Sequence, residues 1–404
     1  MLDKSPNQNN VNVPNDLAAH WMPFTANRAF KKAPRLLAGA KDMHYITVDG
    51  RKIIDAASGM WCTNAGHGRT QISAAIAKQA EALDYAPPFQ FGIPQAFELA
   101  SRIAELAPKG LDHVFFCNSG SEAADTALKI ALAYHQINSQ GSRTRLIGRV
   151  RGYHGVGFGG TSVGGIVNNR KLFGTLLAGV DHLPATYDRE KQAFSRGEPE
   201  YGAHFADELE NLVNLHGANT IAAVIVEPMA GSTGVLPDML TFAKGVTNGS
   251  APMGGVLVRD TIHDAFMNGP EHAVELTHGY TYSAHPLACA AGLATLDIYR
   301  DEKLFERAHS LEPKFADAVM SLKGQPNVLD IRTVGLTAGI DLAPRAADLV
   351  GKRGYDAMVT GFHDHDLMLR IAGDTLALTP PLIVSEDQLG EIIEKVGKVI
   401  KAVA

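Results

Sequence analysis

The stretch HVFFCNSGSEAADTALKIALAYH, residues 113–135, decides the fold class. It begins with a short apolar run that suits a buried strand, and an amphipathic run typical of a helix follows almost at once. Ser119 and Glu122 have the spacing of a capping box, in which a side chain satisfies the first free amides of a helix. A strand that leads directly into a helix indicates an α/β protein.

The same alternation continues along the chain. The run RLIGRV is followed by a glycine-rich loop at 149–165, and the apolar run IAAVIV occupies 221–226. Short apolar runs of this kind predict buried strands of a mostly parallel sheet. Residues 287–305 and 388–403 are predicted helices, and Pro286 suits the first turn of the earlier one. With 404 residues, the chain is long enough for two domains, and a boundary near residue 300 is expected.

Composition narrows the class of protein. The net charge of −6 is spread without basic blocks, which argues against nucleic acid as a partner. The three cysteines form no C-x-x-C pair and H-E-x-x-H is absent, so neither a disulfide framework nor a metal site is expected. The N-terminus lacks the apolar core of a signal peptide, and no run reaches about 18 apolar residues. These features predict a cytoplasmic protein without a membrane partner.

Candidate site residues follow three of the predicted strands. Gly120, at the predicted helix start, lets a ligand approach the backbone, and the helix dipole suits a phosphate; a helix that is merely well capped is the alternative. Tyr153 and His154 follow the second strand, where the tyrosine could stack on a flat cofactor ring or simply pack over a flexible loop. Glu227 ends the strand at 221–226 as a site acid, an ion-pair partner or a cap.

Lys244 lies between the apolar residues TFA and GV. Most lysines are solvated surface groups, but a lysine buried among apolar groups becomes available as a nucleophilic amine. A phosphate site, a stacking aromatic, an acid and such an amine together indicate pyridoxal phosphate. Arg370, in an apolar and strand-like context, could hold a substrate carboxylate through its planar guanidinium, or could be an edge-strand arginine paired with a local acid.

The sequence resembles the class III aminotransferases of the fold type I pyridoxal phosphate enzymes, and among them the β-alanine (ω-amino acid):pyruvate aminotransferases. The resemblance runs nearly end to end. It rests on AHWMPFTANR, DAASGMWCTNAGHGR, DYAPPFQFG, NSGSEAADTALK, GRVRGYHGV, NRKLFG, AAVIVEPMAGSTGVLP, AKGVTNGSAPMG and HGYTYSAHPLACAAGLA.

The resemblance implies a large cofactor domain over 71–300 with a mainly parallel, seven-stranded type of sheet, and a small α+β domain from 1–70 and 301–404. It also implies a homodimer or a dimer of dimers with active sites at the dimer interface. Lys244 would bind the cofactor aldehyde as a Schiff base and move the proton during transfer. The implied cofactor-binding residues are Ser119, Gly120, Ser121, Tyr153, His154, Glu227 and Thr281, with Thr281 reaching the phosphate in the other subunit. The implied substrate-binding residues are Phe24, Trp61 and Arg370.

One segment of the family pattern is missing. Relatives place a helix, a strand ending in Asp-Glu-Val and a further loop between positions matching Pro237 and Asp238, and here the two residues are adjacent. MAGSTGVLP, which follows Glu227 and a proline, is shorter than a helical crossover of about 10–12 residues and has no helical periodicity. We therefore expect an internal deletion that removes one strand and the aspartate that pairs with the cofactor's ring nitrogen.

The resemblance implies transfer of an amino group from an ω-amino acid to pyruvate, giving the semialdehyde and alanine. Two alternatives stay open. One is another class III activity, such as amine:pyruvate transfer. The other is a catalytically impaired or non-catalytic remnant, because the Asp-Glu-Val strand is absent.

Overall fold

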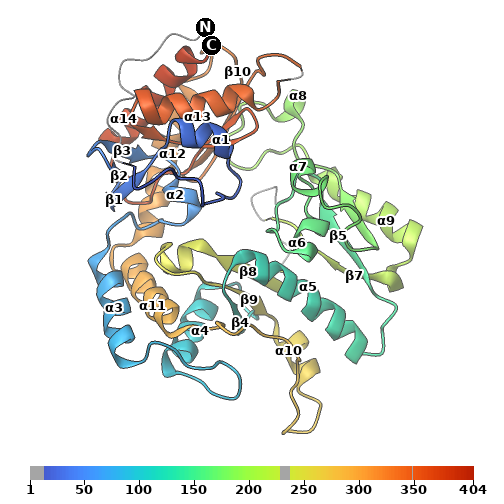
Figure 1. Ribbon diagram of the computed structural model, residues 1–404. Coiled ribbons are helices and arrows are strands. Elements are labelled where there is room, and N and C mark those ends of the chain that lie inside the picture. The colour runs from blue at the N-terminus through green and yellow to red at the C-terminus, as the bar shows by residue number, and fades with distance from the viewer. Residues whose placement is uncertain (1–12, 228–236, 348) are drawn as a thin grey trace. The chain divides into compact units, whose positions relative to one another are not determined.

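The computed structural model describes residues 13–227, 237–347 and 349–404. The chain divides into two compact units. The central unit is Thr70–Lys303, and the terminal unit combines Met1–Arg69 with Leu304–Ala404. Figure 1 labels their elements. Among the described residues, no helix is both long enough and apolar enough to cross a bilayer.

The central unit alternates strands with helices, as the sequence predicts. Its helices are α3 (Thr70–Ala82), α4 (Pro94–Leu106), α5 (Gly120–Ile137), α6 (Phe158–Val163), α7 (Val167–Arg170), α8 (Arg189–Gln192), α9 (Glu208–His216), α10 (Asp260–Phe266) and α11 (Pro286–Asp301), with 3-10 turns η1 (Ala203–Ala206), η2 (Ala218–Thr220) and η4 (Lys244–Thr247). Its strands are β4 (His113–Cys117), β5 (Arg145–Arg149), β6 (Val180–Leu183), β7 (Ile221–Val224), β8 (Met239–Ala243) and β9 (Gly254–Val258). The predicted strand and helix within 113–135 are confirmed, whereas α6 interrupts what the sequence suggested was a continuous loop.

The six strands of the central unit form two three-stranded sheets, β4-β9-β8 and β6-β5-β7, where the sequence predicts one. Only the second is parallel, because β9 runs antiparallel to both β4 and β8. The chain passes from β7 to β8 through residues 225–238. The described strands include none between β7 and β8.

Strand β7 is an edge strand, which corrects the prediction of a buried strand at 221–226. Val224 and Val226 are 40% and 42% exposed. One side of β7 pairs with β5, and no described strand pairs with its other side. Burial of an apolar run depends on the neighbours that cover it, and sequence periodicity does not report those neighbours.

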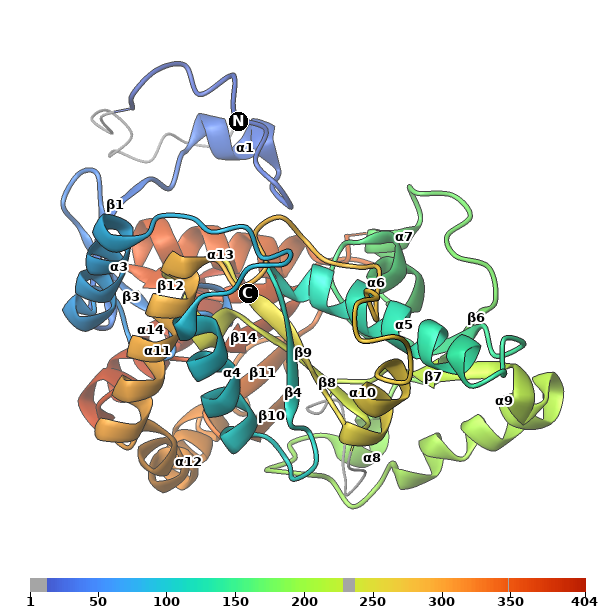
Figure 2. The same ribbon diagram turned by 90° about the horizontal axis from the view of Figure 1, so that it is seen from below.

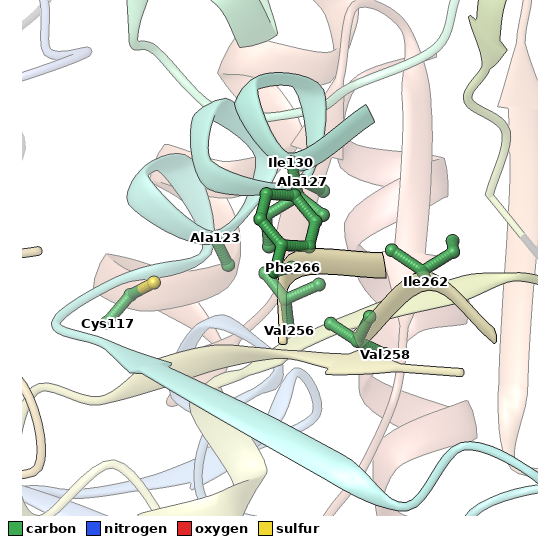
Figure 3. Packing of buried hydrophobic residues seen from close by; sticks show 8 residues of the cluster. All are labelled: Cys117, Ala123, Ala127, Ile130, Val256, Val258, Ile262 and Phe266. Carbon is green, nitrogen blue, oxygen red and sulfur yellow. The ribbon is translucent and has the colours of Figure 1, made fainter. Parts of the chain in front are cut away.

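Helix α5 packs against both sheets of the central unit. Its Ala123, Ala127 and Ile130, spaced for one helical face, form a buried cluster with Val256 of β9 (Figure 3). Leu128, on an adjacent face, belongs to a second buried cluster that includes residues of β5 and β6. Figure 2 shows β4, β9 and β8 side by side near this helix. The two faces of α5 therefore fix its position relative to both sheets.

The terminal unit is an α+β arrangement from both chain ends. Its elements are α1 (Asn27–Lys32), β1 (Leu37–Lys41), β2 (His44–Thr47), β3 (Lys52–Asp55), α2 (Ser58–Trp61), α12 (Leu304–Met320), β10 (Val328–Val334), β11 (Thr337–Leu342), α13 (Lys352–Asp364), β12 (Leu367–Met368), β13 (Arg370–Ala372), β14 (Thr375–Leu378) and α14 (Glu386–Ala402). The strands form two sheets, β1-β2-β3-β12 and β10-β11-β14-β13. Helix α14 confirms the predicted closing helix, and a complete capping box of Ser385 and Gln388 begins it.

Candidate active site

Strand register brings the start of α5 and Lys244 to one edge of the sheet β4-β9-β8. Gly254 of β9 pairs with Cys117 on one side and with Ala243 on the other. Strands β4 and β8 therefore run parallel and end level with each other. Ser119 and Lys244 follow these strands closely, so both leave the sheet at the edge where open α/β sheets bind ligands.

The first turn of α5 is capped as predicted. Ser119 is the N-cap, and its Oγ accepts a hydrogen bond from the backbone N–H of Glu122 at 3.2 Å. The Glu122 carboxylate in turn accepts from the N–H of Asn118 at 2.7 Å. The amides of Gly120 and Ser121 open the helix and have no intrahelical acceptor. Together with the helix dipole, they form a site suited to a phosphate.

Two glycines allow neighbouring backbone to approach this helix start closely. A Cβ atom on Gly155 would lie 2.5 Å from both Cα and Oγ of Ser121, and the next amide, that of Val156, donates to Ser121 Oγ at 3.0 Å. A Cβ atom on Gly120 would lie 3.4 Å from Cβ of Ala243. The loop after β5 and the end of β8 therefore both contact the helix start.

Lys244 opens the 3-10 turn η4 with a φ of 57°. That left-handed conformation is uncommon outside glycine, and such residues cluster at functional sites. The side chain is exposed, which corrects the prediction that Lys244 is buried among apolar groups. The reason is that β8 is an outer strand of its sheet in the described part of the chain. The hydroxyl of Tyr299 donates to the carbonyl of Gly245 at 2.6 Å and so holds the turn.

Glu227 and the loop after β5 are joined directly. Glu227 Oε1 accepts a hydrogen bond from the backbone N–H of Tyr153 at 2.6 Å. Tyr153 itself is 42% exposed, which leaves its ring available to a ligand. A Cβ atom on Gly152 would lie 3.3 Å from His154 Nε2 and 3.4 Å from Glu227 Oε2, so these two polar atoms flank the same glycine. Neither atom has a hydrogen-bond partner among the described residues.

Arg149, which the sequence analysis missed, adds a positive charge to this group. It ends β5, and burial lowers its pKa while the charge of Glu227 opposes that shift. His154 is 9% exposed, and burial lowers its pKa, with Glu227 raising it and Arg149 lowering it further. The sequence could have identified Arg149 by its position at the carboxyl end of a predicted buried strand. Arg149, His154 and Glu227 thus form one electrostatic group behind Tyr153.

Thr281 lies in the exposed turn before α11. Its carbonyl accepts a hydrogen bond from the Tyr85 hydroxyl at 3.1 Å. Pro286 occupies the first turn of α11, as predicted, and His285 caps that helix by accepting from the amide of Leu287 at 3.3 Å. The turn is thus held in place at both of its ends.

The three predicted substrate residues lie in the terminal unit. Arg370 begins β13, the edge strand of its sheet, and its Cζ lies 5.4 Å from the centroid of the Trp61 ring system. That contact is a cation–π interaction of the kind that stabilises an arginine away from bulk water. The Arg370 Nε is buried and has no hydrogen-bond partner within the described residues. Phe24, which precedes α1, is 79% exposed.

Comparison with known families decides the identity. The family model "Aminotransferase class-III" matches residues 25–237 and 231–400. The chain belongs to the class-III aminotransferases. It is 50% identical to the "Omega-aminotransferase" of Caulobacter vibrioides over 431 residues, covering 96% of this chain and 98% of that protein. It is 43% identical to the "Beta-alanine--pyruvate aminotransferase" of Pseudomonas aeruginosa over 440 residues, covering 96% and 97%.

Solved structures place the aminotransferase in fold type I. A thermostable (S)-enantioselective omega-transaminase from Thermomicrobium roseum superimposes with a TM-score of 0.87 at 28% identity, covering 96% of this chain and 97% of that one. An amine transaminase from an uncultivated Pseudomonas species, in its PLP-bound form, gives 0.85 at 28% identity, covering 96% and 99%. This aminotransferase is an enzyme whose cofactor is pyridoxal phosphate. The open amides at the start of α5 and the unpartnered polar atoms of His154 and Glu227 fit such a group.

The alignments with the two curated relatives are longer than this chain. Both relatives therefore have positions without a counterpart here. A deletion between Pro237 and Asp238 stays a prediction. Asp238 itself is exposed and lies 3.4 Å from the Nε of Arg259.

Proposed function

We propose that this aminotransferase transfers the amino group of an ω-amino acid of the β-alanine type to pyruvate, giving the semialdehyde and alanine. The observation that carries the proposal is the contact between Arg370 and Trp61, because it holds a guanidinium ready for a carboxylate. Both proposed substrates carry a carboxylate, and a guanidinium binds that group through two parallel hydrogen bonds. Three relatives with 43–50% identity support the same reaction. Their names are omega-aminotransferase, β-alanine–pyruvate aminotransferase and omega-amino acid–pyruvate aminotransferase.

The residues proposed to bind the cofactor belong to the central unit. When bound, pyridoxal phosphate supplies an aldehyde and an electron-withdrawing ring. The amides of Gly120 and Ser121 would bind the phosphate, and Ser119 keeps them aligned by capping the helix. Lys244 would hold the cofactor covalently through its amine and would move the proton on and off the substrate carbon. Tyr153 would hold the cofactor ring by stacking.

Glu227 and His154 have an orienting role in this proposal. The 2.6 Å hydrogen bond from the Tyr153 amide to Glu227 fixes the backbone that presents the tyrosine ring. His154 is too buried to meet bulk water and packs beside the same carboxylate. Both residues therefore act by positioning Tyr153 and by determining the electrostatic environment behind the tyrosine ring.

The residues proposed to bind the substrate belong to the terminal unit. Arg370 binds the carboxylate of the donor and then that of pyruvate, and the indole of Trp61 limits the directions in which the guanidinium can point. Phe24 and Trp61 supply apolar walls. We also propose that 71–300 is the cofactor domain and that 1–70 and 301–404 form the small domain.

A homodimer, or a dimer of such dimers, is the proposed assembly. Exposed aromatic rings gather near Thr281: the Tyr85 and Tyr282 centroids are 6.0 Å apart, and a Cβ atom on Gly279 would lie 2.8 Å from Cε1 of Phe89. Tyr282 and Phe89 are 58% and 53% exposed. Exposed apolar clusters of this kind mark interaction surfaces. In such a dimer Thr281 would help to hold the phosphate bound by the other subunit. We also propose a cytoplasmic location, because the sequence has only three widely spaced cysteines and no C-x-x-C pair.

Two alternatives define the outcomes of the functional test. An aryl-alkyl amine could replace the ω-amino acid as donor, since the relatives include an amine transaminase. No observation favours a catalytically impaired remnant. Initial rates with β-alanine and pyruvate, compared with an aryl-alkyl amine and pyruvate, separate all three. A faster rate with the amine would replace the proposed donor, and no turnover with either donor would favour the remnant.

Two variants test the proposed residue roles. Lys244→Ala should abolish turnover and also prevent borohydride from fixing the cofactor to the chain, as read by mass spectrometry. Arg370→Met should raise KM for β-alanine and pyruvate by about 10- to 150-fold, the equivalent of one charge-assisted hydrogen bond of roughly 1.5–3 kcal/mol, and spare an amine donor. Arg345→Met is the matched control, because that arginine pairs with Asp356 on the exposed surface of the same unit. Unchanged KM values in Arg370→Met would refute the carboxylate role.

A further inference from the structure

Two histidines and two aspartates gather where β4 begins and α10 begins. His113 is the first residue of β4, and His263 lies on α10 beside Asp264. The candidate ligand atoms of these three residues all lie within 4.8 Å of one another. A fourth side chain, Asp260, contacts His113, with its Oδ1 at 3.1 Å from Nε2. None of these residues takes part in the proposed transamination.

The two imidazoles lie face to face. Their ring centroids are 3.5 Å apart and the planes differ by 4°. His263 Nδ1 also lies 3.3 Å from Asp264 Oδ1. The stack and the two carboxylate contacts keep the four side chains close to one another before any ion is present.

We infer that His113, His263 and Asp264 form a binding site for a divalent transition-metal ion of the Zn²⁺ class. Imidazole nitrogen with a carboxylate oxygen suits Zn²⁺, Ni²⁺, Co²⁺ or Cu²⁺ rather than Mg²⁺ or Ca²⁺, which require mostly oxygen ligands. Three protein ligands leave room for water at the remaining position. Asp260 accepts a hydrogen bond from whichever nitrogen of His113 does not bind the ion, as carboxylates beside metal-binding histidines do.

Binding requires one movement of the side chains. Parallel rings cannot both direct an in-plane nitrogen lone pair at one ion, so at least one imidazole must turn about its side-chain torsions. The side chains of His113 and His263 are 37% and 34% exposed, which gives them space to turn toward solvent. The backbones of β4 and α10 stay where they are. Loss of the ring stack is therefore the structural signature of the occupied site.

The site lies at the far end of β4 from the start of α5. His113 begins the strand and Ser119 follows its end, and five strand residues at about 3.3 Å each separate the two by roughly 17 Å or more. The ion would join the beginning of β4 to α10, and so stabilise the central unit rather than take part in amino transfer.

Isothermal titration of chelator-treated, tag-free holoenzyme with Zn²⁺ tests the inference. We expect one ion per chain at micromolar concentrations, and His113→Gln and His263→Gln should each weaken binding by at least about tenfold. His309→Gln is the matched control, because His309 is exposed and lies 3.7 Å from a single carboxylate, that of Glu312. It should bind Zn²⁺ as the unmodified protein does. Bound Co²⁺ should show the visible absorption of nitrogen and oxygen ligands.

Three results would overturn the inference. They are the absence of saturable binding to the unmodified protein, a loss smaller than about tenfold in either histidine variant that folds, and an equal loss in His309→Gln. Thermal unfolding without metal first establishes that each variant is folded. Should one histidine variant fail to fold, the other decides the question, because each imidazole supplies a ligand.

Discussion

Replacement of Glu227 tests how the loop that carries Tyr153 is held in place. Glu227 Oε1 accepts the Tyr153 amide at 2.6 Å, and Arg149 interacts with the same carboxylate electrostatically. Glu227→Ala removes both the acceptor and the charge. Glu227→Gln removes the charge and keeps an oxygen acceptor of similar reach. The two variants therefore separate the hydrogen bond from the ionic contribution.

The structure sets the expected magnitudes. A hydrogen bond to a charged group contributes about 1.5–3 kcal/mol and a neutral one about 0.5–1.5 kcal/mol. Because Glu227 is partly exposed, we expect losses of about 2 kcal/mol for Glu227→Ala and about 1 kcal/mol for Glu227→Gln. If the cofactor must reorder the loop when it binds, the whole loss of free energy appears as weaker binding of the cofactor to the protein. The dissociation constant of pyridoxal phosphate then rises by up to about 30-fold and about 5-fold.

Titration of the apoenzyme with pyridoxal phosphate, followed by visible absorption, measures both constants. Glu105→Gln is the matched control, because Glu105 is an exposed glutamate on α4 of the same unit. It should leave the dissociation constant within about twofold, as expected of a surface substitution. Equal effects of Glu227→Ala and Glu227→Gln would refute the role of the hydrogen bond. The absence of any effect would refute the positioning role of Glu227 altogether.

Three further predictions concern stability. In Gly148→Ala the new Cβ would lie 1.8 Å from the carbonyl oxygen of Val163. Thermal unfolding should therefore show that the free energy of unfolding falls by about 1–3 kcal/mol or more. In the control Gly390→Ala the new Cβ would have no atom within 4 Å, so this variant should be as stable as the unmodified protein or more stable. Ser385→Ala removes the capping box of α14, so urea unfolding should show that the free energy of unfolding falls by about 1 kcal/mol. The control Ser310→Ala changes an exposed serine of α12 and should not show this loss. Burial lowers the pKa of His154 and of His182, so the unfolded chain binds more protons than the folded one at acid pH. The urea midpoint should therefore fall as the pH drops below about 6.5, the usual pKa of histidine, and stay nearly constant above that pH. A urea midpoint that does not change as the pH falls below about 6.5 would contradict the lowered pKa values of His154 and His182.

The sequence predicts best those features that depend on a few adjacent residues. The cap at Ser119, the helix that follows it and the proline at the start of α11 are local, because each needs only the backbone of its own turn. The family resemblance adds the identity, since its motifs extend along nearly the whole chain.

What the sequence does not predict depends on distant neighbours. The exposure of Val224 and of Lys244 follows from the position of β7 and β8 at the edges of their sheets. An apolar run looks the same whether one or two strands flank it, so periodicity overestimates its burial. Arg149 escaped notice for a similar reason. Its relation to Glu227 exists only because β5 and β7 pair in parallel and end side by side.

The proposed site is positioned more by missing side chains than by side-chain contacts. Gly254 lies between the ends of β4 and β8, and a Cβ atom there would be 2.5 Å from the carbonyl oxygen of Ser119. Gly155 meets Ser121 as closely. Because backbone cannot move aside as a flexible side chain can, Gly254 fixes the distance between the start of α5 and the end of β8, and Gly155 fixes the distance between that helix start and the loop after β5. In the proposed site, strand register and Gly254 would therefore set how far Lys244 lies from a phosphate bound at the start of α5.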